Sequence, residues 1–384
     1  MSLGSKYAPY RYKKPLFYSP NKLIIWAGQF GPPTASYRMR AKGEEMNLRS
    51  SLRRSTGAIS AAVVAISMLA AGLTGISAAS AATPTNVAYL SASSANTWLK
   101  ASKVQMDRIA KANNIKITEF DAQFKPGEQA KQIQDVIASG KYKGLIIASV
   151  DGAGIIPSLK EAIDAGLKVG ILNQVVGTKL DTAKPQFAGP SVVVMVPPKV
   201  SGERLGRLTL QACKGKTSCK VVFFYGIKGI PLDTAIKEGY DSVVSTNPAI
   251  TIVAEGEGKY LGPDVAQKAM QDILSSTPNF DVVVGPDQAI QGVVLALSDA
   301  GKLGTAKLIG FGGSKAAING VKNGTWFADL FGAPATEGKL LMDAMVKALK
   351  TGKKSGGIDP GTKLPDNGLV TKANVSKFKA EWNG

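Results

Sequence analysis

Gly144-Leu-Ile-Ile-Ala-Ser149 and Lys168-Val-Gly-Ile-Leu172 are two short apolar runs that flank an amphipathic stretch at residues 155–165. Apolar runs of this length, rich in β-branched residues, are typical of buried strands, whereas apolar residues three or four positions apart are typical of a helix. Strand, helix and strand in this order predict a βαβ unit with parallel strands and helices on both faces of the sheet.

The same alternation continues on both sides of this unit. Further strands are expected at residues 86–90, 115–120, 219–225, 251–255, 281–285 and 306–310, and further helices at 98–112, 128–139, 202–211, 232–245, 264–275 and 289–300. The pattern makes two successive units, each of the usual size of one domain. We therefore predict an α/β protein of two doubly wound, Rossmann-like lobes, with a ligand site in the cleft beyond the carboxyl ends of the strands.

The N-terminal region predicts export. Residues 46–81 contain a basic start, an apolar run at 58–71 and small residues that end in Ala79-Ser80-Ala81, which is the order of a secretory signal peptide cleaved near Ala81. The apolar run is short for a retained membrane anchor. Arg53-Arg54 leaves a twin-arginine signal open beside the general secretory route. The protein is thus expected in the periplasm or outside the cell.

Residues 1–45 have neither helical nor strand periodicity. Lys42-Gly-Glu-Glu45 could be encoded by a purine run that resembles a ribosome-binding site just before Met46. Our hypothesis is that Met46 is the start and that residues 1–45 are an untranslated leader read in frame, or a disordered one.

The charge distribution argues against a nucleic-acid partner. About half of the net charge of +19 lies in residues 1–81, which contain 11 Lys and Arg against 2 Asp and Glu. The remaining positive charge is spread evenly, without basic runs or interleaved aromatic residues.

The chain contains no histidine, which removes the commonest general base and the commonest metal ligand. A Ser-His-Asp or Cys-His arrangement is therefore impossible. We predict no catalytic residues, no metal and no cofactor. A secreted enzyme that works through Asp, Glu, Lys or Tyr stays open as an alternative.

Cys213 and Cys219 are the two cysteines, and both lie in the exported part. An oxidising compartment and a close pair predict a disulfide between them. The enclosed Gly215-Lys216-Thr217 matches a fragment of a phosphate-binding loop, but the first glycine of that motif is missing, so a surface turn is expected.

Several motifs together resemble those of the ribose-binding and autoinducer-2-binding branch of periplasmic solute-binding proteins. They are Asp121-Ala-Gln-Phe-Lys-Pro126, Gln132-Ile-Gln-Asp135, Gly144–Ser149, Val282-Val-Val-Gly-Pro-Asp-Gln288 and Leu308-Ile-Gly-Phe-Gly-Gly313. The resemblance spans nearly all of residues 86–375. It implies a type I periplasmic binding protein fold, whose lobes are joined by three crossovers near residues 188–192, 332 and 361–364. The N-terminal lobe would then contain residues 82–190 and 333–363, and the C-terminal lobe residues 191–332 and 364–384.

The resemblance also implies a set of ligand-binding residues, at or near strand ends. They are Trp98, Asn173, Gln174, Asp233, Tyr260, Pro286, Asp287 and Gln288. Trp98 and Tyr260 would stack on the ligand, because an aromatic ring packs well on the C–H face of a sugar. Open alternatives are core packing for Trp98, turn capping for Asn173, and helix capping for Asp233 and Asp287.

The expected site departs from the ribose-binding pattern. Asn173-Gln174 replaces an Asp-Arg pair, and Ile236, Pro286 and Gly312 replace an Arg, an Asn and an Asp. The charge-assisted bonds that hold a hydroxyl-rich ring are thereby lost. The predicted ligand is a neutral or weakly polar small sugar, deoxysugar, polyol or autoinducer-2-like molecule, bound more tightly than ribose.

The function that this resemblance implies is capture of a small carbohydrate-like ligand by an exported, monomeric protein and its delivery to an ABC transporter permease. A sensory ligand-binding protein is the alternative, serving a chemoreceptor or resembling a LacI-type effector domain. The latter would need a helix-turn-helix where the export signal stands. Of the tryptophans, Trp326 is expected to be buried, and Trp382 to lie in a polar, lysine-rich tail.

Overall fold

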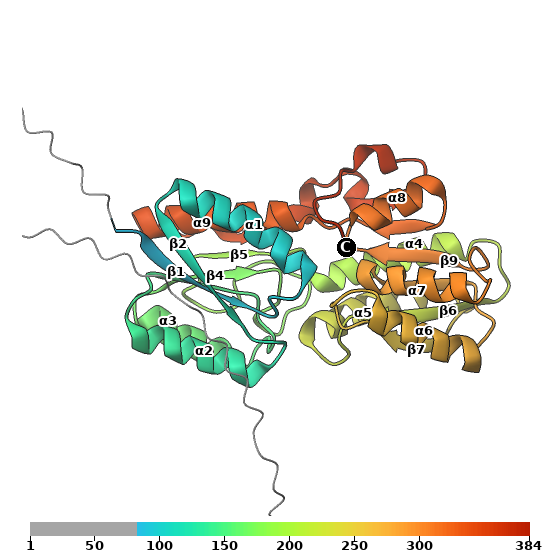
Figure 1. Ribbon diagram of the computed structural model, residues 1–384, viewed down its shortest axis with the longest axis horizontal. Helices are drawn as coiled ribbons and strands as arrows, with labels where there is room; N and C mark the ends of the chain where they lie inside the picture. The colour runs from blue at the N-terminus through green and yellow to red at the C-terminus, as the bar shows by residue number, and fades with distance from the viewer. Residues whose placement is uncertain (1–82) are drawn as a thin grey trace, which may run out of the picture. The chain divides into compact units, whose positions relative to one another are not determined.

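Two six-stranded sheets with helices on both faces make up the described part of the protein, residues 83–384 of a computed structural model (Figure 1). All described residues belong to one compact unit. The expected leader at 1–45 and signal peptide at 46–81 lie outside them. The predicted fold class, two doubly wound α/β lobes, is confirmed.

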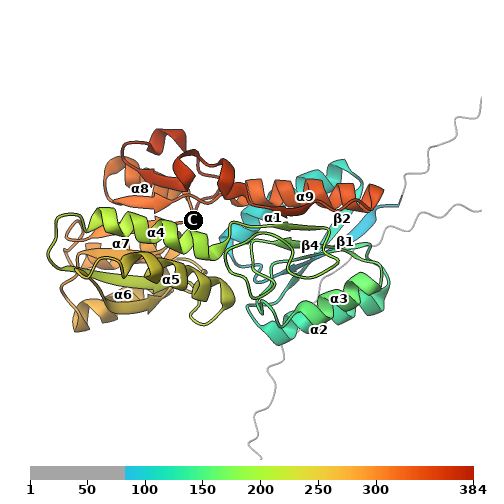
Figure 2. The ribbon, with the colours of Figure 1, turned by 180° about the vertical axis from the view of Figure 1, so that it is seen from behind.

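The first sheet has the strand order β2-β1-β3-β4-β5-β11, and every neighbouring pair is parallel. Its strands are β1 (Thr85–Ser91), β2 (Ile115–Asp121), β3 (Gly144–Ile147), β4 (Lys168–Leu172), β5 (Val192–Val194) and β11 (Gly356–Ile358). Helices α1 (Thr97–Ala112) and α9 (Pro334–Thr351) cover one face, and α2 (Pro126–Ser139) and α3 (Ile156–Asp164) the other. Figures 1 and 2 show α1 and α9 side by side although they lie far apart in the sequence.

Alternation along the strands explains why they are apolar throughout. Tyr89 of β1 and Ile146 of β3 pack beneath α1 and α9, whereas Leu90 and Ile147 pack against α2 and α3. Successive side chains of a strand point to opposite faces, so a sheet covered on both faces needs continuous apolar runs.

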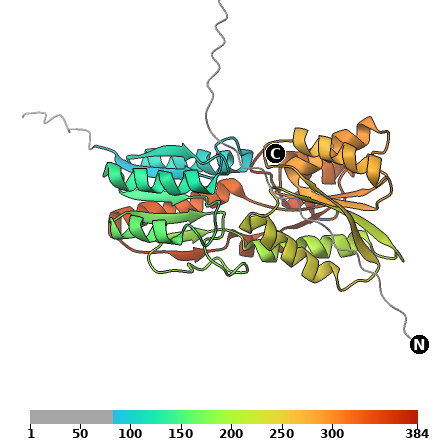
Figure 3. The ribbon, with the colours of Figure 1, turned by 90° about the horizontal axis from the view of Figure 1, so that it is seen from below.

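The second sheet repeats the strand arrangement of the first except for the direction of its last edge strand, with the order β7-β6-β8-β9-β10-β12. Its strands are β6 (Cys219–Tyr225), β7 (Ile250–Glu257), β8 (Val282–Pro286), β9 (Lys307–Phe311), β10 (Ala328–Leu330) and β12 (Leu369–Thr371), of which only β10 and β12 pair antiparallel. Helices α4 (Pro198–Ala212) and α5 (Pro231–Val244) cover one face, and α6 (Asp264–Ser276), α7 (Asp287–Asp299) and α8 (Lys315–Asn323) the other. Figure 3 shows α4 and α5, in yellow-green and olive, across this sheet from the orange α6 and α7.

The chain passes between the two sheets three times. It does so between β5 and α4, between β10 and α9, and between β11 and β12. The second and third passages contain the expected positions at residues 332 and 361–364. The first follows β5, because residues 192–194 pair with β4 and β11 in the first sheet. The N-terminal lobe therefore continues beyond residue 190.

Helices α4 and α5 approach each other closely through glycines. A methyl group at Gly202 would overlap the carbonyl group of Ile236, and one at Gly239 would overlap that of Lys199. These backbones can touch only because no side chain stands between them.

No helix within residues 83–384 is long and apolar enough to cross a membrane.

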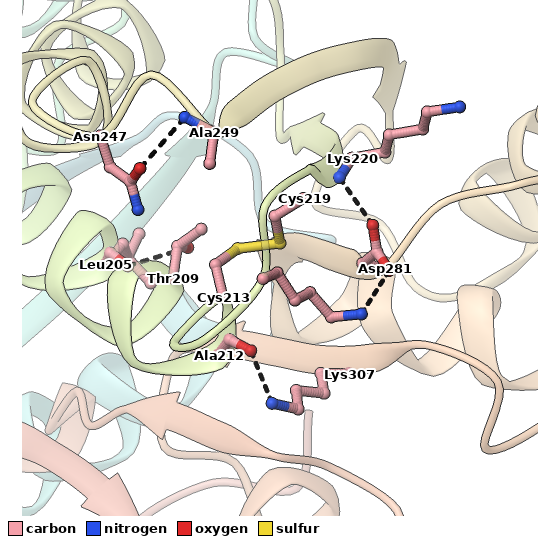
Figure 4. The surroundings of a disulfide bond; sticks show 11 residues. Leu205, Thr209, Ala212, Cys213, Cys219, Lys220, Asn247, Ala249, Asp281 and Lys307 are labelled. Carbon is pink, nitrogen blue, oxygen red and sulfur yellow. Dashed lines mark hydrogen bonds and ion pairs between the residues drawn. A yellow bond between two sulfur atoms is a disulfide. The ribbon is translucent and has the colours of Figure 1, made fainter.

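The predicted disulfide between Cys213 and Cys219 is confirmed (Figure 4). It joins the end of α4 to the start of β6 and encloses the exposed residues 214–218. Asp281 fastens this loop, since its carboxylate accepts hydrogen bonds from Lys216 Nζ and from the Lys220 amide, both at 2.8 Å. The Gly-Lys-Thr fragment lies in the exposed loop.

Candidate functional site

A cavity of about 120 Å³ lies between the two lobes, where the carboxyl ends of both parallel sheets meet. Its walls are loops and helix starts that follow strands: Asn96 and Trp98 come after β1, Asn173 after β4, and Tyr260 after β7. In open α/β sheets ligands bind at this edge, because the strand order reverses there and the connecting loops diverge. The small volume limits the occupant to a small molecule.

Aromatic side chains form much of the wall. They are Trp98, Phe124, Tyr260, Phe311, Phe331 and Trp382. Trp98, at the start of α1, meets Trp382 edge to face, with 5.4 Å between ring centroids and 73° between ring planes. Rings from both lobes thus offer apolar faces to one small volume.

Trp382 is placed differently from our expectation. Instead of lying in a polar tail, it is 7% exposed and forms part of the cavity wall. The expectation is wrong because the nearby Lys377 and Lys379 are exposed, whereas the indole of Trp382 is buried. Trp326 is buried in the core of the second lobe, as predicted.

Asn173, Gln174 and Glu337 form a polar chain at the first lobe's side of the cavity. Asn173 Nδ2 donates to Glu337 Oε2 at 3.1 Å, and Gln174 Nε2 donates to Asn173 Oδ1 at 3.2 Å. Asn173 also serves the turn after β4, where its φ is +62°. Burial raises the pKa of Glu337 to about 8, against the opposing effects of the Asn173 and Trp98 side chains. At neutral pH this end of the cavity is therefore largely uncharged.

Tyr260 and Asp233 occupy different layers of the second lobe. The Tyr260 ring lies over Gly226 and lines the cavity, and its hydroxyl donates to Asp233 Oδ1 at 3.0 Å. Asp233 is 2% exposed and also accepts hydrogen bonds from the amides of Gly226 and Ile227. Its burial raises its pKa to about 6. Asp233 therefore lies behind the cavity and holds Tyr260 and the loop after β6 in place.

Of the three expected ligand-binding residues Pro286, Asp287 and Gln288, two line the cavity and one is buried away from it. Pro286 at the end of β8 and Gln288 in the first turn of α7 line the cavity. The Asp287 carboxylate is fully buried instead, beside that of Asp329, and accepts from the Ser314 amide at 2.7 Å. Burial raises the pKa of both carboxyl groups. Asp287 thus supports the loop between β9 and α8.

Sequence reasoning missed two charged residues of the cavity wall, Arg204 and Glu337. Arg204 comes from α4 and is half-buried, and its guanidinium faces Asp359 of the third crossover. Glu337 lies in the first turn of α9. Both lie on helices that begin at crossovers rather than directly after a strand of their own lobe. The expectation that ligand-binding residues follow the carboxyl ends of strands therefore did not point to them.

Asn96 was also missed, although its position before an amphipathic helix is a common signal of an N-cap. Its Oδ1 accepts from the Leu99 amide at 2.9 Å, and its Nδ2 donates to the Tyr260 carbonyl of the other lobe at 3.3 Å. Asn96 therefore both starts α1 and bridges the lobes. Among residues 83–384, no group of three or more His, Cys, Asp or Glu is arranged to hold a metal ion.

Comparison with known proteins gives one family and several relatives. A family model described as a periplasmic binding protein domain matches residues 87–354. The xylitol-binding protein of Mycolicibacterium smegmatis is 26% identical over 286 residues, which cover 73% of this chain and 75% of that protein. The galactofuranose-binding protein of Escherichia coli K12 is 24% identical over 224 residues, 57% of this chain and 68% of that protein. A crystal structure of a galactofuranose binding protein, 21% identical, matches with a TM-score of 0.67 over 77% of this chain and 97% of that chain.

Proposed function

The chain belongs to the periplasmic binding protein family, whose members bind solutes rather than catalyse reactions, and from this premise we propose that it binds a small sugar or polyol between its lobes. The observation that carries the proposal is the cavity wall, in which aromatic faces from both lobes surround uncharged amide groups. A sugar or polyol has C–H faces that suit the rings, and hydroxyl groups that suit amides, because an amide both donates and accepts hydrogen bonds.

The ligand we propose is neutral. Among the described residues, the charged groups of the wall are Arg204 and Glu337. Glu337 is largely protonated at neutral pH and can donate a hydrogen bond to a hydroxyl oxygen, and Asp359 faces Arg204 and offsets its charge. Gln288 makes no side-chain hydrogen bond to another residue of 83–384, so its amide is free for the ligand.

Ribose is not the ligand we favour. Ile236 lines the cavity where the resemblance implies an arginine, and Pro286 and Gly312 line it where Asn and Asp are implied. These are the positions that the ribose-binding pattern uses to hydrogen-bond the hydroxyl groups of ribose, so ribose loses its matched partners here. The names of the two relatives, a xylitol-binding and a galactofuranose-binding protein, support polyols and furanose sugars as the class to test.

The wider role that we propose is delivery of this ligand by an exported, monomeric protein to an ABC transporter permease. The signal-like order of residues 46–81 supports export, and so does the disulfide, which is typical of oxidising compartments. Lobe closure around the ligand would give the permease a conformation to recognise.

Thermal unfolding in the presence of xylitol, arabinose, galactose, myo-inositol and ribose tests the proposal. Millimolar concentrations avoid the general stabilisation that polyols give at high concentration. We expect at least one of xylitol, arabinose, galactose and myo-inositol to raise Tm more than ribose does, and Gln288→Ala to reduce that rise. The exposed Glu238→Ala is the matched control and should respond as the wild type does. Equal responses of wild type and Gln288→Ala would place binding elsewhere.

A further inference from the structure

Residues 378–384, which we call the C-terminal segment, are anchored in the second lobe. Phe378 packs against Phe331, with 5.1 Å between ring centroids. The indole N–H of Trp382 donates to the Gly312 carbonyl at 2.7 Å, and the Trp382 carbonyl accepts from the Lys315 amide at 2.9 Å. Lys315 begins α8 and Gly312 follows β9, so these contacts hold the segment to one body.

The same segment also contacts the first lobe. The Glu381 carboxylate accepts hydrogen bonds from the amide and the hydroxyl of Thr336, at 2.8 and 2.5 Å. Thr336 lies in the first turn of α9, whose N-cap residue, Ala333, has no side-chain acceptor. Glu381 therefore supplies the missing cap from another part of the chain, where a negative charge is favoured by the helix dipole.

Trp382 separates the cavity from the outside. Its side chain lines the cavity between the lobes and also an open groove between α1 and α8, on the outer side of the segment. On the inner side its ring meets Trp98 of the first lobe. A molecule in the cavity thus lies against a wall that belongs to the second lobe but is braced by the first.

We propose that the C-terminal segment is a clasp, in which Trp382 contacts the ligand and Glu381 is a positioning residue that holds Trp382 over the closed cavity. This inference rests on the proposed function. When the lobes separate, Trp382 stays with Gly312 and Lys315, while Trp98 and the start of α9 leave with the first lobe. The Glu381–Thr336 and Trp382–Trp98 contacts exist only in the closed form, so they add to its stability and, through it, to the apparent affinity.

The test compares Glu381→Ala, Trp382→Ala and Trp382→Phe with the control Glu238→Ala, which removes an exposed carboxylate from α5. Small-angle X-ray scattering of the ligand-free proteins should give a larger radius of gyration for Glu381→Ala than for the control. Amide hydrogen exchange at the start of α9 should be about tenfold or more faster in that variant. Saturation with xylitol should abolish the difference in scattering, which a merely destabilised protein would not do.

Calorimetry with xylitol completes the test. Trp382→Ala should weaken binding by about ten- to a hundredfold and Trp382→Phe by much less, because the ring face survives. Glu381→Gln keeps an acceptor for Thr336 and should restore most of the wild-type behaviour. Unchanged scattering and exchange in Glu381→Ala, or wild-type affinity in Trp382→Ala, would overturn the clasp. If wild type does not bind xylitol, the proposed ligand class is at fault, and scattering and exchange alone decide the clasp.

Discussion

Glu337 illustrates how burial determines the chemistry of a single residue. Its side chain is 1% exposed and accepts a hydrogen bond from Asn173 Nδ2. A carboxylate at such a place is costly to ionise, so the proton is retained at neutral pH. The cavity therefore has an acid that can donate to a hydroxyl group without adding charge.

The pH dependence of stability should report this proton. Because the pKa of Glu337 rises from an ordinary 4.5 to about 8 on folding, the folded protein binds more protons than the unfolded chain between these values. Stability should therefore fall as pH rises through this window, by on the order of 1 kcal/mol per pH unit. Glu337→Gln should lose less stability than wild type between pH 5 and 9 in urea unfolding. Parallel pH profiles of the two proteins would contradict the raised pKa.

Trp98 and Trp382 should act as a pair when ligand binds. Trp98→Ala should weaken binding by roughly 1 to 3 kcal/mol, and Trp98→Phe by much less, if the ring is the anchor. Because the two indoles are in contact, each single Trp→Phe variant should keep part of the ligand-induced fluorescence change, and the double variant should lose it. A full response in the double variant would assign the signal to one of the other tryptophans, Trp26 or the buried Trp326, and would contradict the pairing.

The resemblance implied Trp98, Asn173 and Gln288 as ligand-binding residues at or near strand ends, and all three line the cavity. It could not tell which of two neighbours faces the cavity, since this depends on local backbone angles and on hydrogen-bond partners from other loops. For example, Asp233 and Asp287 are buried, whereas Tyr260 and Pro286 line the cavity. The position of Trp382 in the cavity wall could not be predicted, because it depends on a contact with Trp98, which lies far away in the sequence, and no local pattern encodes such a contact.

At the scale of elements, the pair α4 and α5 depends on its glycines. Gly202→Ala should place a methyl group against the Ile236 carbonyl and lower the free energy of unfolding by about 1 to 3 kcal/mol. Gly127→Ala in α2 is the matched control, because its methyl group would meet no atom within 4 Å, and it should be neutral or slightly stabilising. Equal denaturation midpoints for the two variants would rule out the close approach as a constraint.

Most of the longer elements were predicted from the sequence, but the 18-residue helix α9 and the shorter α8 were not, and neither were the short strands β5 and β11. Continuous apolar runs such as β3 and amphipathic stretches such as α2 carry their own signal. β5 and β11 have three residues each, too few for a pattern of their own, and they are strands because β5 pairs with β4 and β11 pairs with β5. Missing β5 displaced the expected first crossover toward the N-terminus.

At the scale of the whole molecule, two sheets of the same topology place their carboxyl ends on one cavity. Asn96 and the C-terminal segment reach across from lobe to lobe at its edge. These contacts are polar or aromatic, whereas each lobe has its own apolar cores. Such a design would let the lobes separate without loss of either core, and the ligand that we propose would shift the balance toward closure.

The most direct test of the account is titration calorimetry of the protein with xylitol and, separately, with ribose. We predict one site per chain, tighter binding of xylitol than of ribose, and a loss of xylitol affinity in Asn173→Ala, which removes the amide that bridges Gln174 and Glu337. Tighter binding of ribose, or xylitol binding that is indifferent to Asn173→Ala, would contradict it.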